Sequence, residues 1–175
     1  MASVLNVDQI NNAAGTSAVT IDANTGKASS PNGATLQAGS VLQVTPLSTS
    51  TTSTNYQSTS FVDIAGLSIA MTPFSASSDI YVTFSFMTYH LLGGGGGIQV
   101  MQDGSAVANQ GSNPSYENYT GNSDIYSRLH KTVLVSAGNT NSRTYTLQIR
   151  TYSSVTVQSN PGASQSFMYA MEVAR

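Results

Sequence analysis

Residues 79–92 read DIYVTFSFMTYHLL and form the longest alternating run in the chain. One side of this run carries the large apolar residues Ile80, Val82, Phe84 and Phe86. The other side carries Tyr81, Thr83, Ser85, Met87 and Tyr89. Apolar residues at every second position are typical of a β-strand that turns one face toward a core. The run therefore predicts a long, centrally placed strand.

Similar but shorter runs occur on both sides of this stretch, at 67–71, 98–102, 129–135, 143–151 and 167–174. We expect the five glycines Gly93–Gly97 to form a flexible hairpin loop that joins the long strand to the next one, which runs to an Asp103-Gly104 turn. No segment has the periodicity of a helix. About eight short strands with frequent turns predict an all-β fold, an antiparallel β-sandwich that is jelly-roll-like.

The composition changes along the chain and predicts three parts. Residues 1–45 form an extended N-terminal arm, residues 46–60 form a Ser/Thr-rich connector, and residues 61–175 form the sandwich head. The connector reads either as a flexible linker or as an extended peripheral strand, since threonine is common in strands. The arm has too few large side chains to form a hydrophobic core of its own. Its small apolar group is expected to pack on another protein or on copies of the chain: Val4, Leu5, Val7 and Ile10.

The charge content excludes several classes of partner. Only 8% of residues are charged, against about 25% in ordinary soluble domains. The net charge of −2 and the absence of a basic cluster argue against nucleic acid and against anionic membranes. The chain has no cysteine, so disulfides and thiolate metal sites are excluded. We also expect no cleaved signal peptide and no membrane insertion, because no apolar stretch approaches the required length.

Catalytic candidates are few. His90 and His130 each read as structural histidines, and no metalloprotease, nucleophile-elbow or phosphate-loop motif is present. The only plausible carboxylate set for glycoside hydrolysis is Asp103, Glu117 and Asp124. We therefore expect neither an enzyme nor a cofactor or metal site.

Two strands carry apolar residues on both faces. Phe167, Tyr169, Met171 and Val173 are expected to point inward from the last strand. Met168 and Ala170 would then lie on its outer face, as Met87 and Tyr89 do on the long strand. Because the outer face of an antiparallel sheet is normally polar, these four residues predict a contact between copies, which we expect to form a homotrimer.

The polar stretch 109–127 has no periodicity and is the best candidate for a recognition loop. Its candidate ligand-binding residues are Tyr116, Asn118, Tyr119, Asn122 and Tyr126. Tyrosine rings and side-chain amides together suit the faces and hydroxyl groups of sugars. A solvated loop with some tyrosines packed against the head explains the same residues equally well.

Three segments resemble structural proteins of tailed bacteriophages. Residues 4–26 (VLNVDQINNAAGTSAVTIDANTG) resemble the start of many tail-fibre proteins, and residues 61–82 (FVDIAGLSIAMTPFSASSDIYV) resemble a segment of their C-terminal β domains. The closing FMYAMEVA, residues 167–174, is similar to their last strand. The three segments are structural and contain no catalytic or ligand-binding motif. Proteins of this kind vary in the region that corresponds to residues 92–165.

The resemblance implies a virion protein, assembled in the host cytoplasm, that is often a homotrimer. Its arm would attach to another virion protein of the tail or capsid, through Val4, Leu5, Val7 and Ile10. For a fibre of this kind, the recognition loop 109–127 is the candidate for binding host-surface polysaccharide. The chain lacks the long shaft of such fibres, which leaves a short fibre or a fibre tip. The alternative is a capsid decoration, head-fibre or tail adaptor protein with a purely architectural role.

Overall fold

The computed structural model describes residues 9–11, 17–21, 28–29, 38–90, 94–107, 116–119, 124–152 and 156–175. The chain divides into two compact units, residues 1–38 and residues 39–175. Described by itself, the first unit contains a three-stranded antiparallel sheet in the order β1-β2-β3. Its strands are β1 (Gln9–Asn11), β2 (Ser17–Ile21) and β3 (Ala28–Ser29).

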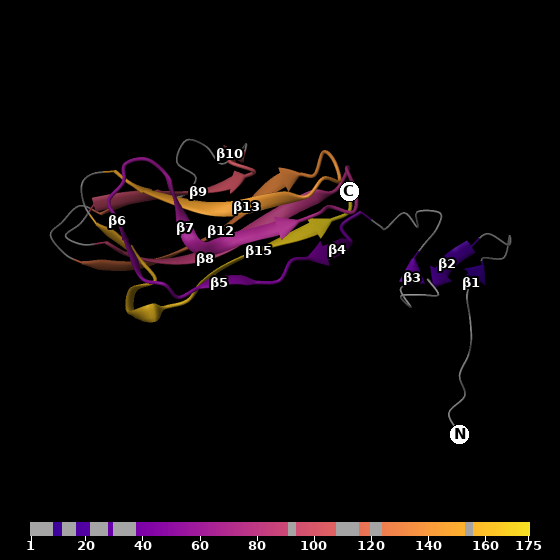
Figure 1. Ribbon diagram of the computed structural model, residues 1–175, viewed down its shortest axis with the longest axis horizontal. Coiled ribbons are helices and arrows are strands. Elements are labelled where there is room, and N and C mark those ends of the chain that lie inside the picture. The colour runs from indigo at the N-terminus through magenta and orange to yellow at the C-terminus, as the bar shows by residue number, and fades with distance from the viewer. Residues whose placement is uncertain are drawn as a thin grey trace, which may run out of the picture. The chain divides into compact units, whose positions relative to one another are not determined.

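The second unit is all-β, with two antiparallel sheets that form a β-sandwich (Figure 1). The seven-stranded sheet contains β4 (Val41–Val44), β5 (Ser48–Ser50), β6 (Thr54–Tyr56), β8 (Asp79–His90), β12 (Ile125–Ser136), β14 (Val157–Ser159) and β15 (Ser166–Val173). The five-stranded sheet contains β7 (Val62–Met71), β9 (Gly94–Gln102), β10 (Ser105–Ala106), β11 (Tyr116–Tyr119) and β13 (Arg143–Thr151). A single 3₁₀ turn, η1 (Pro161–Ala163), precedes β15.

The long strand is central, as the sequence predicts. β8 pairs along its full length with β12 on one side, and with β15 and β14 on the other. Its residues Ile80, Val82, Phe84 and Phe86 are buried between the sheets. Tyr145, Leu147 and Ile149 of β13 are buried opposite them. Burial of each such side chain stabilises the fold by roughly 1.5–3 kcal/mol, so these two strands provide much of the core.

The expected hairpin across the glycine run is wrong. β8 lies in the seven-stranded sheet and β9 in the five-stranded sheet, so the chain crosses between sheets at this point. Gly94–Gly97 are also not a loop, because they form the first part of β9 and pair with β11. A side chain at Gly96 would be tightly placed, because an added Cβ would lie 3.1 Å from the carbonyl oxygen of Arg150. The glycines therefore allow neighbouring strands to approach closely.

The inward face of the last strand is opposite to the one predicted. Met168 and Ala170 are completely buried in the core, whereas Phe167, Tyr169 and Met171 are only half-buried. Met168 is paired with Phe84 and Ala170 with Val82, both of which point inward from β8. Met168 and Ala170 thus belong to the core of one chain and are not part of an outer surface.

The boundary of the second unit falls before β4, at residues 38 and 39. β4 and β5 pair with β15, and β6 pairs with β14. The segments 41–44, 48–50 and 54–56 are therefore strands of the head, which fits the peripheral-strand interpretation of the Ser/Thr-rich stretch.

Candidate functional site

The two ends of the sandwich differ, and we name them by the residues found there. At the basal end, β8 begins at Asp79, β15 ends at Val173 and the chain arrives from Gly39. At the apical end, β8 ends at His90 and β12 begins at Ile125. In Figure 1 the C-terminus and β4 lie at one end of the sandwich and β6 at the other.

The basal end is closed by contacts between the two ends of the head. The N–H groups of Gly39 and Ala174 donate to the carbonyl oxygens of Ala174 and Ser40, each at 2.8 Å. Arg175 forms a salt bridge with Asp79, with Nη2 and Oδ1 2.8 Å apart. The first residues of the head are therefore held beside the C-terminus.

A buried carboxylate fastens the loop between β7 and β8 to the last strand. Glu172 is fully buried, and its oxygens accept hydrogen bonds from Ser78 Oγ at 2.5 Å and Gln43 Nε2 at 2.6 Å. The N–H groups of Phe74 and Ser75 donate to it at 3.0 Å and 3.1 Å. Burial alone would raise the pKa of Glu172, but these four hydrogen bonds outweigh burial and lower it. The carboxylate of Glu172 therefore has a structural role: it holds the β7–β8 loop against β15.

Apolar side chains are exposed on two opposite edges of the sandwich. The edge formed by β4, β5 and β7 carries Val41, Val44, Leu47 and Phe74, which are 54%, 55%, 55% and 71% exposed. The opposite edge, formed by β12 and the β9–β10 hairpin, carries Leu134 at 45%. Except for Leu47, near the middle of its edge, these residues lie toward the basal end. Single exposed apolar residues are ordinary, whereas a contiguous exposed apolar patch is typical of an interaction surface.

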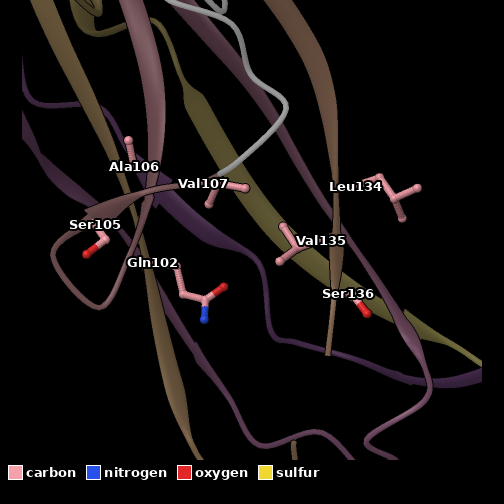
Figure 2. Close-up of a pocket in the computed structure, with 7 residues that line it drawn as sticks. All are labelled: Gln102, Ser105, Ala106, Val107, Leu134, Val135 and Ser136. Carbon is pink, nitrogen blue, oxygen red and sulfur yellow. The ribbon is translucent and has the colours of Figure 1, made fainter. Parts of the chain in front are cut away.

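The edge with Leu134 is hollowed. A cleft of about 390 Å³ separates the β9–β10 hairpin from β12, and Figure 2 shows its seven lining residues. They are Gln102, Ser105, Ala106, Val107, Leu134, Val135 and Ser136. None of these side chains is ionisable, so the cleft has no acid, base or nucleophilic pair for catalysis. Four of the seven lining side chains are apolar and three are neutral and polar.

The three carboxylates considered for glycoside hydrolysis are not gathered at one place. Asp103 lies in the β9–β10 turn, where its Oδ1 accepts a hydrogen bond from the Thr144 N–H at the basal end. Asp124 lies at the apical end, beside Tyr89. Glu117 lies in β11, paired with Gly96. Among the described ranges, no group of three His, Asp or Glu side chains could hold a metal ion.

The two histidines lie in different environments. His90 is 1% exposed at the apical end of β8, near Val157 and Gly96. His130 is exposed on the outer side of β12. In the part of the chain that the structure describes, no helix has the length and apolar character needed to cross a membrane.

An aromatic pair marks the apical end of the seven-stranded sheet. The rings of Tyr89 and Tyr126 lie with centroids 4.7 Å apart and planes inclined by 33°. Tyr89 Oη donates a hydrogen bond to Asp124 Oδ2 at 2.6 Å. This bond, together with the carboxylate charge, raises the pKa of Tyr89 to about 12. Tyr89, an expected interface residue, and Tyr126, an expected ligand-binding residue, are thus neighbours.

The remaining recognition candidates are only partly placed. Tyr116, Asn118 and Tyr119 lie in β11, paired with Gly97, Gly95 and Gly94 of the five-stranded sheet. Asn122 lies outside the described residues. Part of the stretch expected to be a loop is therefore strand, since glycine-rich β9 gives β11 a partner.

The remaining predicted residues are Met87, expected at a contact between copies, and the four apolar residues of the arm. Met87 is half-buried on the outer face of β8. In the arm, Ile10 lies in β1, paired with Val19, while Val4, Leu5 and Val7 lie outside the described residues.

Sequence reasoning missed one further aromatic cluster at the apical end. The guanidinium of Arg150 lies 4.6 Å from the ring centroid of Phe61 and 4.8 Å from that of Tyr152. A cation over an aromatic face is attracted by the ring. The Arg-Thr-Tyr spacing puts Arg150 and Tyr152 near each other in sequence, but nothing in the sequence connects them to Phe61.

No protein-family model matches this chain, and no curated protein matches it either.

Proposed function

We propose that this chain is a structural protein of a phage virion, a fibre or fibre-tip subunit that assembles as a homotrimer. Support comes from the three segments that resemble tail-fibre proteins and from the all-β sandwich. The arm is proposed to attach the subunit to another virion protein, with the head carried beyond it. The chemistry of the described surfaces suits packing and recognition, and no activity is proposed.

The observation that carries the proposal is the pair of apolar edges. A cyclic trimer needs two different surfaces on each copy, because each subunit contacts its neighbours head-to-tail. Phe74 and Val44 project from one edge, and the uncharged cleft beside Leu134 lies on the other. We propose that the Phe74 edge of one copy packs into the cleft of the next.

The position of these edges fits an assembly organised by the arm. Val41, Phe74 and Leu134 all lie toward the basal end, where Gly39 receives the chain from residues 1–38. Arms that associate hold the attached heads at high effective concentration, which strengthens weak contacts between them. The edges therefore need not bind strongly on their own.

Mass measurement tests the proposal. Mass photometry or light scattering of the purified protein is expected to give about three times 18.2 kDa. A monodisperse monomer at micromolar concentration would reject the homotrimer. Reconstruction of intact particles then tests virion location, and also separates a fibre that exposes its apical end from a decoration protein that covers it.

A further inference from the structure

A cross-strand row of four polar and aromatic residues crosses the outer face of the seven-stranded sheet at its apical end. Tyr126 of β12 is paired with Tyr89 of β8. Gln158 of β14 is paired with Tyr89 on one side and with Asn55 of β6 on the other. Adjacent strands lie about 4.8 Å apart, so the row is roughly 14 Å wide.

The aromatic half of the row is fixed and accessible. Tyr126 is 63% exposed. The ring of Tyr89 lies beside it, with the two ring centroids 4.7 Å apart, and Tyr89 is itself held by its hydrogen bond to Asp124. A ring held in this way loses little side-chain freedom when a ligand stacks on it, which favours binding.

The amide half of the row is also oriented. Gln158 Nε2 donates to Asn55 Oδ1 at 3.1 Å. This bond uses one donor of Gln158 and one acceptor position of Asn55, and the remaining amide groups comprise an acceptor on Gln158 and donors on Asn55. Asn55 is exposed and Gln158 half-buried, so both can meet a ligand that lies across the sheet.

We propose that the row of Tyr126, Tyr89, Gln158 and Asn55 binds a short neutral oligosaccharide. One pyranose ring stacks on Tyr126, and the hydroxyl groups of the next unit bond to the amides of Gln158 and Asn55. The exposed carboxylate of Asp124 beside Tyr126 repels uronic acids and other anionic sugars. This inference rests on the proposed function only in supposing that the ligand belongs to a host surface.

Saturation-transfer NMR on the full chain tests the site directly. The probes are the neutral trisaccharides maltotriose, mannotriose and tri-N-acetylchitotriose, with trigalacturonate as the anionic probe. We expect transfer from tyrosine protons to at least one neutral trisaccharide and none to trigalacturonate. Tyr126→Ala is expected to weaken that binding about tenfold, which corresponds to about 1.4 kcal/mol.

His130→Ala is the matched control, because His130 carries an exposed ring on the outer face of the same strand and belongs neither to the row nor to the cleft. It is expected to leave binding unchanged, and Tyr126→Phe is expected to retain most of it. Absence of transfer to every neutral trisaccharide, or equal binding by Tyr126→Ala, would overturn the proposal. The mass of the same samples reports the trimer separately, so a trimeric protein that binds no sugar rejects this inference alone.

Discussion

Gly39 and Ala174 are joined backbone to backbone, the Gly39 N–H donating to the Ala174 carbonyl oxygen at 2.8 Å. The head thus receives its preceding segment beside its own C-terminus. Tyr126 lies at the opposite end of the sandwich, where β12 begins. A head attached through residues 1–38 can therefore present its apical row away from the point of attachment.

Truncation can test where the compact unit of residues 39–175 begins. Deletion of residues 1–38 is expected to leave a cooperatively unfolding head, because residues 39–175 form their own compact unit. Deletion of residues 1–44 also removes β4 and its pairing with β15, together with the hydrogen bond from Gln43 to Glu172. Calorimetry should show a clearly lower melting temperature for the longer deletion. Equal melting temperatures would mean that β4 contributes nothing to the head.

Glu172→Gln should lower stability at neutral pH. Hydrogen bonds to a charged group contribute about 1.5–3 kcal/mol, so we expect a loss on the order of 2 kcal/mol in urea titrations. Asp63→Asn is the control, because exposed Asp63 accepts one hydrogen bond, from Gln148, and its change should stay within about 0.5 kcal/mol.

The hydrogen bonds to Glu172 also predict that the stability of the head depends on pH. Because the folded pKa of Glu172 is lowered from its ordinary 4.5, its contribution is present above that value. The contribution is lost as the pH falls through the folded pKa. The free energy of unfolding should therefore fall more steeply below pH 4.5 in the original protein than in Glu172→Gln. Parallel pH curves for the two proteins would contradict this account.

Asp124→Asn should lower the pKa of Tyr89 from about 12 toward its ordinary 10. The carboxylate accepts the phenol hydrogen and its charge opposes phenolate formation. The amide of asparagine carries no charge and is a weaker acceptor, so the substitution removes the effect of the charge and weakens the hydrogen bond. ¹³C NMR of labelled tyrosines, followed against pH, measures the shift. A Tyr89 signal with unchanged titration would show that Asp124 does not hold this ring.

Two glycines of β9 should differ in how much stability is lost when each is replaced by alanine. Gly96→Ala places its Cβ 3.1 Å from the backbone oxygen of Arg150, and we expect a cost of about 1–3 kcal/mol. At Gly97 the added Cβ would meet Tyr152 Oη at 2.8 Å, the far end of a side chain that can rotate. Thermal melts should therefore show a smaller loss for Gly97→Ala. The reverse order would contradict the placement of β11, β9 and β13.

Alternation in the sequence was enough to predict the core face of β8. It failed for β15, because Met168 and Ala170 alternate with the apolar residues Phe167, Tyr169 and Met171, and alternation alone does not say which set points inward. Met168, Ala170 and Glu172 are the inward set. Glutamate is rarely buried, so its place in the inward set could not be predicted from residue type. Glu172 is accommodated because Ser78, Gln43 and two backbone N–H groups donate hydrogen bonds to it.

Strand partners were beyond the reach of the sequence. Glycine is rare in strands, yet Gly94–Gly97 are strand because β11 and β13 approach them closely. Of the apical row, only Tyr126 was predicted as a recognition residue. Gln158 and Asn55 meet there through pairing of β14 with β6, and two isolated amides in polar stretches carry no signal of that pairing.

Cysteine cross-linking tests the head-to-tail homotrimer most directly, since the chain has no cysteine of its own. Ala76→Cys lies in the exposed loop next to Phe74, and Ser105→Cys lies at the cleft. A mixture of the two single variants should form disulfide-linked dimers on oxidation, each variant alone should not, and the double variant should give covalent trimers. Disulfide-linked dimers of either single variant with itself, with no dimer that joins the two variants in the mixture, would contradict the account.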